Sequence, residues 1–541
     1  MTEHAPGVPL GTWLAELSDE QLVRLLELRP DLTQPPPGTI AALAARAQSR
    51  QSVKAATDAL DFLHLAVLDA LLVLHADTAP VPVTKLLELL GDRADPDDVT
   101  AALATLRERA LVWGDTAVRV AAEAAGSLPW YPGQATVEDT GHTAEDITAR
   151  LAELDTAQSE LLARLLEGSP LGRTRDAAPG TPPDRPVQRL LAAGLLRQLD
   201  DETVILPRLV GQVLRGEAPG PVRLRPPDPV VSTTTAADVD AVAAGAALEL
   251  LREAEVVLET LGAAPVAELR SGGLGVRDLK RLSKSTGIDE RRLGLILEVA
   301  AGAGLIAAGT PDAVPDDGSA PFWAPTVAAD RFIESPPAVR WHVLASTWLD
   351  LPARPGLIGS RGPDAKPYAA LSDALYSTAA PLDRRLLLSV LADLPPGAGG
   401  DARSLSAAMI WRRPRWAARL QPEPVEALLE EAHALGLVGR GAIATPSRVL
   451  LSADDAESVV AAMADALPSP VDHFLVQADL TVVVPGPLER ELAEQLSVVA
   501  RVESAGAAMV YRVTEDSIRH ALDTGRTAGD LHSFFERHSK T

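Results

Sequence analysis

Apolar and polar positions follow the same succession four times along the chain. Each time, helical segments with an apolar stripe lead to a short apolar phrase and then to extended runs. These phrases lie at 108–120, 192–206, 302–309 and 434–446. In the third case the preceding helices are predicted at 248–262, 275–287 and 289–301. Three helices, a glycine-leucine step and two strands are the order of a winged helix, so we expect four such domains.

Stretches rich in helix and strand breakers separate these repeats. The intervals between the phrases are unequal, which favours separate domains over a solenoid of fixed period. Linkers are predicted at 127–142, 216–235, 309–325 and 352–368. A proline-rich stretch, 173–186, shortens or replaces the second helix of the second repeat, and a helical insertion, 338–384, precedes the fourth. The expected domains are a helical region at 1–60, winged helices at 61–126, 143–215, 240–326 and 338–466, and a last module at 468–541.

The last module has a different pattern. The run FLVQADLTVVV, 474–484, is rich in β-branched residues and is stopped by a Pro-Gly-Pro turn, which is typical of a buried strand. A helix with one apolar face, a second strand and two capped helices follow, at 489–504, 507–514, 515–525 and 527–539. The predicted fold class is mainly α, with tandem winged-helix domains followed by a small α+β module of order β-α-β-α-α.

Short phrases in this module resemble the N-terminal domain of the XPB/Ssl2 DNA-repair helicases. The match rests on VQAD, YRVT, ALDTG and SKT, at 476–479, 511–514, 521–525 and 539–541. Near the start, SDEQLVRLLELRPDL, PPP and SRQSVKAATDALD resemble a large actinobacterial helicase-associated family. In the helicases this domain is not the motor, and it docks with a similar domain of a winged-helix subunit. The resemblance therefore implies a docking module, with an XPB-type helicase or the transcription machinery as partner, and nothing catalytic.

Net charge and amino-acid composition limit which partners and which kinds of site the chain can have. The formal net charge is −24 and the pI about 4.9, so any DNA contact needs a surface that is locally positive. Cysteine is absent, which excludes disulfides and thiolate metal sites. The first residues lack the basic and apolar regions of a signal peptide, and no apolar run approaches about 18 residues. We expect a cytoplasmic protein, associated with the nucleoid if it binds DNA.

Residue patterns that carry catalysis were not found. A nucleotide-driven motor needs a phosphate loop of the form G-x-x-x-x-G-K-[ST], which does not occur in the chain. The glycine-rich stretch 302–309 follows a helix instead of a strand, and 359–362 departs from the nucleophile-elbow pattern. The histidines of the last module lack the spacing of metal ligands on one helix face. We therefore expect no enzymatic activity, no cofactor and no metal.

One helix of the third repeat is predicted to carry a basic face. Its apolar side is formed by Val276, Leu279 and Leu282. The opposite side, together with the start of the next helix, supplies the first candidate DNA contacts, Arg277, Lys280, Arg281, Lys284, Arg291 and Arg292. Acidic residues nearby offset part of this charge. A solvated helix face is therefore an alternative interpretation, and a protein interface is a third.

A second basic stretch lies in the fourth repeat, in IWRRPRWAARL at 410–420. Trp411 and Trp416 alternate there with arginines, in a chain with only 3% aromatic residues. The candidate DNA contacts in this stretch are Arg412, Arg413 and Arg415. Arginine with tryptophan can stack on bases and hold phosphates, or anchor a protein interface. Packing of the tryptophans in the core of the repeat is the remaining interpretation.

These patterns favour a non-catalytic DNA-binding protein that acts in DNA repair or transcription, with an XPB-type helicase as a candidate partner. The second helix of the third repeat would position phosphates, and its third helix would enter the major groove. The alternative is a protein–protein scaffold of winged helices that binds no nucleic acid, which the net charge favours.

Overall fold

The computed structural model describes residues 8–136, 142–217, 224–311, 321–362, 365–504 and 509–540. Helices make up 57% of it and strands 12%, so the prediction of a mainly α protein is confirmed. The chain forms two compact units, unit 1 from Met1–Pro229 with Arg403–Pro424 and unit 2 from Val230–Ala402 with Val425–Thr541. The first seven residues, parts of all four predicted linkers, the first two residues of AAMVYRVT and Thr541 lie outside the described residues.

Unit 1 opens with a cluster of short helices. Ser18 and Gln21 form a reciprocal capping pair at the start of α2. The buried guanidinium of Arg29 donates to the carbonyl oxygens of Ala47 and Arg109 at 3.0 and 2.9 Å, and so ties three segments together. The helices are α1 (Leu10–Ala15), α2 (Asp19–Leu28), α3 (Ile40–Ala47) and α4 (Arg50–Asp58).

Two repeats of one order of elements follow in unit 1: helix, strand, helix, helix, strand, strand. The first consists of α5 (Phe62–Val73), β1 (Val81–Pro82), α6 (Val83–Leu90), α7 (Pro96–Glu108), β2 (Val112–Trp113) and β3 (Ala117–Val120). The second consists of α9 (Thr156–Glu167), β4 (Leu171–Arg173), the 3-10 turn η4 (Arg175–Ala177), α10 (Pro186–Ala192), β5 (Arg197–Asp200) and β6 (Thr203–Ile205), flanked by α8 (Ala144–Leu151) and α11 (Arg208–Leu214). In both, the last strand lies between the other two.

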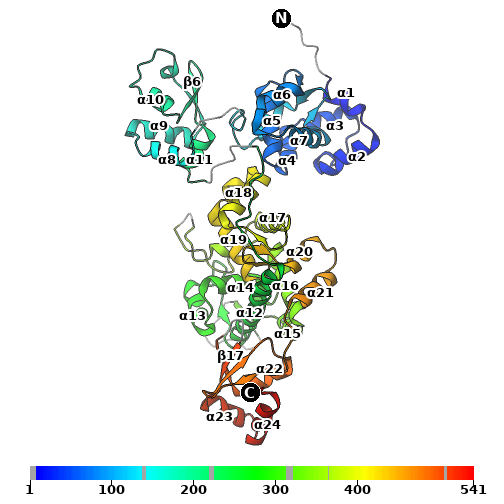
Figure 1. Ribbon diagram of the computed structural model, residues 1–541, viewed down its shortest axis with the longest axis vertical. Helices are drawn as coiled ribbons and strands as arrows, with labels where there is room; N and C mark the ends of the chain where they lie inside the picture. Colours follow the sequence, from blue (N-terminus) through cyan, green and yellow to red (C-terminus); the bar gives the residue numbers. More distant parts are fainter. Residues whose placement is uncertain are drawn as a thin grey trace. The chain divides into compact units, whose positions relative to one another are not determined.

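Unit 2 contains the third repeat, whose first helix is long. It begins at Ala236 and not at 248 as the sequence suggested, because Thr235 caps it by accepting from the Asp238 amide. The elements are α12 (Ala236–Ala263), β8 (Val266–Ala267), α13 (Val276–Thr286), α14 (Glu290–Gly302), β9 (Ile306–Gly309) and β10 (Phe322–Pro325), with strand order β8-β10-β9. Helix α12 packs beside α14 and beside α16 (Pro337–Asp350) in unit 2 (Figure 1).

The fourth repeat has the same order of elements with a different strand pairing. It consists of α17 (Ala380–Ala392), β11 (Ala398–Gly399), α18 (Ala402–Arg412), α19 (Pro422–Ala434), β12 (Val438–Gly439) and β13 (Ala442–Ile443). Strand β12 pairs with β13, whereas β11 pairs with β7 (Ser232–Thr233). The flanking helices are α15 (Val327–Glu334), α16, α20 (Thr445–Ser452) and α21 (Ala456–Ala466). The strand pairs predicted after the apolar phrases are thus confirmed, although the second strand of the third pair, β10, lies within the predicted linker 309–325, whose end is therefore wrong. The strand after each first helix was not predicted.

The C-terminal module is a four-stranded antiparallel sheet with three helices. Its elements are β14 (Leu475–Val476), β15 (Thr481–Val484), α22 (Arg490–Val499), β16 (Arg501–Ser504), β17 (Met509–Arg512), α23 (Glu515–Asp523) and α24 (Ala528–His538), with strand order β14-β15-β17-β16. The predicted order β-α-β-α-α is therefore wrong. The run 474–484 is a hairpin, because Leu480 takes a φ of 67° and the Gln477 amide donates to the Thr481 carbonyl at 2.8 Å. The last residues of the predicted helix 489–504 form β16.

Strand β12 and helix α12 of unit 2 make a close backbone contact at a glycine. A methyl group on Gly439, in β12, would lie 2.3 Å from the Val239 carbonyl oxygen of α12, so only glycine fits there. Gly245, on the exposed side of α12, has no atom within 4 Å of such a methyl group. An added methyl group therefore meets backbone atoms at the strand glycine and open space at the helix glycine.

We predict that Gly439→Ala lowers the free energy of unfolding by about 1–3 kcal/mol, because the strand must move away from the helix backbone. Gly245→Ala should raise it by about 0.5–1 kcal/mol, since alanine loses less backbone entropy in a helix. Urea unfolding followed by circular dichroism measures both changes. Equal effects of the two substitutions would contradict this account of the contact.

Candidate nucleic-acid interface

Helix α13 presents the predicted basic face to solvent. Leu279 and Leu282 are buried against α12 and α14, and Gly287, with a φ of 73°, ends the helix. The side chains on the opposite side are all exposed, namely Arg277, Lys280, Arg281 and Lys284. The structure therefore brings together the four cationic residues that helical spacing predicted.

Three of these four cations are not in an ion pair with any described residue. Arg281 pairs with Asp278, one turn earlier, at 2.8 Å. Within the described part of the chain, Arg277, Lys280 and Lys284 make no hydrogen bond or ion pair. Helix α13 lies at the outer edge of unit 2 in the view of Figure 1. A positive strip with three uncompensated charges is therefore open to an anionic partner.

The two arginines at the start of α14 are held by acidic residues. Arg291 Nη1 lies 2.9 Å from Glu430 Oε2 of α19, and Arg292 Nε contacts the carboxylate of Glu253 in α12. These arginines also line a cavity of about 170 Å³ between the start of α14, the turn at 355–357 and α19. Neither guanidinium is thus placed on the open face that α13 presents.

Helix α14 has no exposed side along most of its length. All eight residues from Leu293 to Ala300 are buried. Part of the cover is a segment of the same chain, residues 351–362 with 365–376, here called the covering segment. The Leu371 amide donates to the carboxylate of Glu298, and a methyl group on Gly294 would lie 2.7 Å from Ile358 Cδ1. The expectation that this third helix enters the major groove is therefore corrected, because a groove-bound helix must leave one side free.

A buried charge network lies under the covering segment. The Arg384 guanidinium is fully buried and donates to the carbonyl oxygens of Trp348, Leu351 and Ala353. Glu431 accepts from Trp348 Nε1 at 2.7 Å and from the Gly356 amide at 3.0 Å, and lies 3.6 Å from Arg384. Arg384 follows the buried-leucine spacing of α17, so a cation on the apolar stripe was a signal in the sequence that pattern analysis missed.

Burial governs the protonation of the carboxylates in this network. Loss of hydration raises the pKa of Glu298 to about 7, despite the hydrogen bond from the Leu371 amide and the attraction of Arg384. The same loss raises the pKa of Glu431, which Arg384 opposes. Glu253 also has a raised pKa through burial, and its partner Arg292 opposes that shift.

The second basic stretch packs inside unit 1. Trp411 is 6% exposed and stacks on Phe62 with ring centroids 5.3 Å apart. Arg415 donates to the Thr57 hydroxyl and the Ser127 carbonyl at 3.0 and 2.9 Å and lies 3.5 Å from Asp58. The remaining two arginines of the prediction are also engaged: Arg413 donates to a backbone carbonyl and lies over Trp416, and Arg412 has partners as well. Trp411 is thus packed in a core, as one interpretation held, but in that of the first repeat and not of the fourth.

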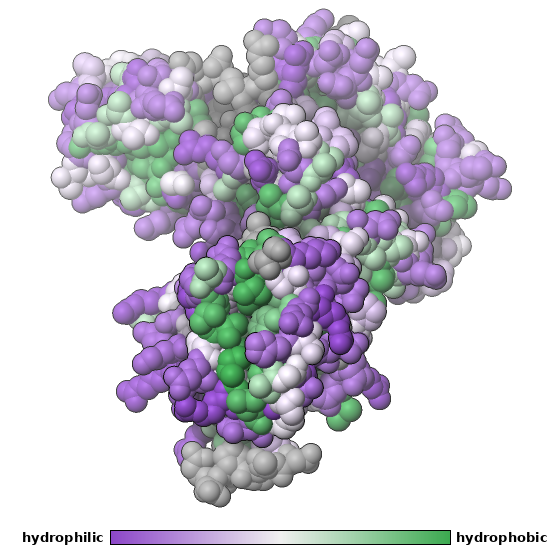
Figure 2. All heavy atoms as spheres, turned by 60° about the horizontal axis from the view of Figure 1, so that its bottom comes forward, coloured by the Kyte–Doolittle hydropathy of each residue, from purple (hydrophilic) through white to green (hydrophobic). Residues whose placement is uncertain are grey.

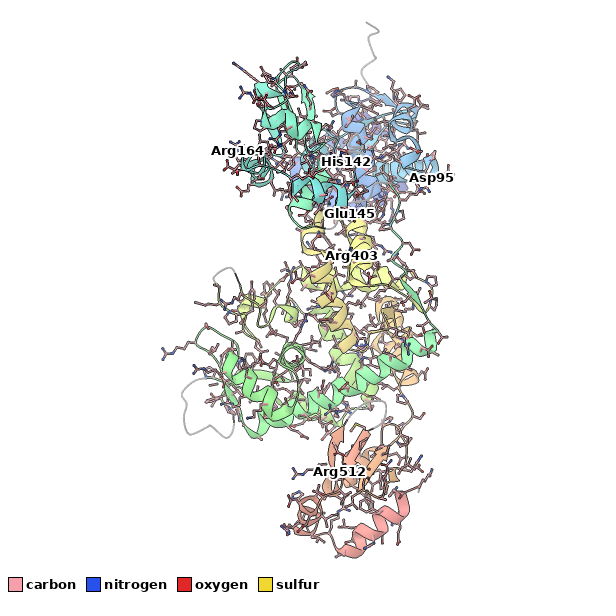
Figure 3. The ribbon with its side chains drawn as sticks, turned by 60° about the vertical axis from the view of Figure 1, so that its left-hand side comes forward. Asp95, His142, Glu145, Arg164, Arg403 and Arg512 are labelled. Atoms are coloured by element: carbon pink, nitrogen blue, oxygen red, sulfur yellow. The ribbon has the colours of Figure 1, made fainter. Side chains whose placement is uncertain are left out.

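Charged side chains of the C-terminal module are paired on its sheet. Arg512 of β17, labelled in Figure 3, donates from two nitrogens to the two carboxylate oxygens of Glu503 at 3.1 and 3.0 Å. It also donates to the Asp479 carbonyl. Among the described residues there is no group of three or more His, Asp or Glu placed to hold a metal ion. No helix in the described ranges combines the length and apolar character that a bilayer crossing requires.

Comparison with known proteins bears on this module. Residues 474–541 match the family model of the helicase conserved C-terminal domain. The C-terminal module resembles a helicase C-terminal domain. This match spans every strand and helix of the module and confirms the prediction that the end of the chain is helicase-associated. A search of curated proteins found no match to the chain.

We predict that Glu298→Gln reduces the dependence of stability on pH. The folded-state pKa of about 7 lies above the ordinary value of 4.5, so the folded state binds the proton more tightly. The stability contributed by this group is complete below pH 4.5 and is lost as the pH rises through 7.

Glutamine is neutral at every pH, like the protonated carboxyl group. The variant therefore keeps the stability that protonated Glu298 contributes, even as the pH rises. Between about pH 5 and pH 8 the wild type should therefore lose up to about 3 kcal/mol more unfolding free energy than the variant. Urea unfolding at a series of pH values measures the difference. Parallel pH profiles of the two proteins would contradict the assignment.

Proposed function

We propose that the chain is a non-enzymatic protein that binds double-stranded DNA through the exposed face of α13. In this proposal it acts in DNA repair or transcription, and its C-terminal module docks to an XPB-type helicase. The observation that carries the DNA part is the strip of three uncompensated cations on α13, Arg277, Lys280 and Lys284, in a chain of net charge −24. Such a strip is what contact with a phosphate backbone requires.

The order of elements supports interpreting the repeats as winged helices. All four repeats run helix, strand, helix, helix, strand, strand, although the second helix of the second repeat is a single 3-10 turn. In the first three repeats the last strand lies between the other two. Winged and other helix-turn-helix domains place a helix pair on DNA, with one helix across the backbone. In the third repeat α13 occupies the position of that backbone-facing helix.

We predict that Lys280→Glu with Lys284→Glu weakens duplex binding by about tenfold or more, because two phosphate contacts become repulsive. Lys85→Glu is a control for charge reversal at one lysine, since Lys85 is exposed on α6, the corresponding helix of the first repeat. Fluorescence anisotropy with a labelled duplex at low salt measures the affinities. If wild type and variant bind alike, or the wild type does not bind, the DNA proposal is wrong.

A protein–protein scaffold is the second candidate function. The observation that favours it is the burial of α14, because the helix that would contact DNA in a winged helix is used for packing within unit 2. Repeats that pack in this way can build a rigid framework for partner proteins. Absence of duplex binding by the wild type at low salt would favour this candidate.

The sheet of the C-terminal module offers a surface for the helicase partner. Leu475, Val483 and Val510 are directly paired across three strands, so they lie on one face, opposite the buried Val482 and Tyr511. Leu475 is 38% exposed. In Figure 2 the end of the chain that holds the module comes forward, and the surface nearest the viewer carries a strip of hydrophobic residues bordered by hydrophilic ones. An apolar row with a polar border suits a protein interface.

We predict that Leu475→Glu weakens binding to a purified XPB-type helicase by about tenfold, because a charge would be buried at the contact. Leu522→Glu on α23 is the control, since Leu522 is similarly exposed but lies outside this row. Surface plasmon resonance with the full chain measures both. Equal binding of the two variants, or no binding by the wild type, would refute this docking surface.

A further inference from the structure

We infer that the third repeat binds the sugar-phosphate backbone of duplex DNA without distinguishing base sequence. This inference rests on the proposed function and specifies its ligand: a row of phosphodiesters on one strand of a duplex. Three observations support it: the burial of α14, the types of side chain exposed on α13, and the length of the basic strip.

Base recognition needs a side chain that enters a groove from an exposed helix or strand. The body of α14 is closed by α12, α13, α16 and the covering segment, with eight consecutive buried residues. Its first turn is exposed, but Arg291 is paired with Glu430 and Arg292 with Glu253. Apart from Arg291, whose pair with Glu430 is half-exposed, the helix that would supply base contacts in this repeat is therefore enclosed or engaged.

The neutral polar side chains of α13 are also committed. Ser283 donates to the Ile288 carbonyl at 2.6 Å, and Ser285 and Thr286 donate to the Leu282 carbonyl at 3.0 and 2.8 Å. The helix contains no Asn or Gln, the residues that pair with adenine. What remains on its exposed face are Arg and Lys side chains. In a major groove these could pair with guanine, but on a helix that lies across the backbone they meet phosphate oxygens. Contacts of this kind fix position and carry no sequence information.

The size of the strip sets the number of contacts. Residues 277–284 span about 10 Å along the helix axis, at about 1.5 Å per residue. The roughly 3.4 Å that one DNA strand advances per nucleotide is measured along the duplex axis, and the phosphates of the winding strand lie further apart, so the strip can meet about two or three of them. The upper figure equals the number of cations without a partner in the described chain, Arg277, Lys280 and Lys284.

The test measures the affinity of the full chain for three labelled duplexes of equal length and different sequence, with a duplex RNA as a further arm. We expect affinities for the DNA duplexes that agree within about threefold, since only phosphates are contacted. With about three contacts, a rise from about 50 to about 150 mM salt should weaken binding about 20-fold. Lys280→Gln should remove about one contact, so that the same rise weakens binding only about sevenfold. Lys85→Gln should behave as wild type.

The outcomes separate this inference from the proposed function. Absence of binding to every nucleic acid overturns both. Binding to DNA with more than about tenfold preference for one sequence overturns the inference and leaves the proposed function intact. An unchanged salt dependence in Lys280→Gln, with a wild-type circular dichroism spectrum, overturns the assignment to α13. Tighter binding to the RNA duplex overturns DNA as the ligand.

Discussion

The buried guanidinium of Arg384 determines how unit 2 is built around α14. Its three carbonyl partners lie where α16 ends and the covering segment begins, and Glu431 of α19 supplies its negative charge. A buried cation is tolerated only when hydrogen bonds and a counter-charge replace its hydration, and loss of one partner of such a pair costs about 3–5 kcal/mol. The path of the covering segment is therefore fixed by the need to supply those carbonyl groups.

This constraint explains why α14 is buried while α13 stays exposed. Once the covering segment is held, Ile358 lies against Gly294 and Leu371 binds Glu298, so that α14 is enclosed. Helix α13 packs only its two leucines inward and keeps its cations free. The third helix of the repeat, α14, is thus part of the core, and the second helix, α13, provides the exposed surface. In a DNA-binding winged helix it is the third helix that contacts the bases.

Patterns that depend on neighbours in sequence were predictable, and contacts between distant segments were not. Helical spacing was enough to place Arg277, Lys280, Arg281 and Lys284 on one face, because that spacing is set by the backbone. The partners of Arg291 and Arg292 lie on other helices, 139 and 39 positions away for Glu430 and Glu253, and no local pattern specifies them. The hairpin at 474–484 was missed because its turn depends on Leu480 adopting a positive φ, which leucine rarely does.

The two basic stretches show why residue type alone does not identify an interface. Arg412, Arg413 and Arg415 alternate with tryptophans. Trp411 is buried on Phe62, and Arg413 and Arg415 then donate to the Ala59 carbonyl and the Thr57 hydroxyl at the end of α4. Around α13 the apolar residues are leucines spaced for one side of a helix, so their burial leaves the opposite side free. The arrangement of the apolar residues, more than the number of cations, decides which stretch stays exposed.

The negative charge of the whole chain acts on this strip differently at different distances. At about 0.1 M salt, charges more than about 10 Å apart are largely screened, and the strip itself is about that long. Asp278, the acidic residue within α13, is already paired with Arg281. A phosphate in contact with α13 therefore experiences mainly positive charge, although the chain carries −24. At about 0.01 M salt the screening length grows to about 30 Å, so the acidic remainder opposes the approach of DNA while the direct contacts strengthen. Lowering the salt thus strengthens both the repulsion from the acidic remainder and the direct attraction to phosphate, which oppose each other. Only the direct attraction depends on which cations α13 carries.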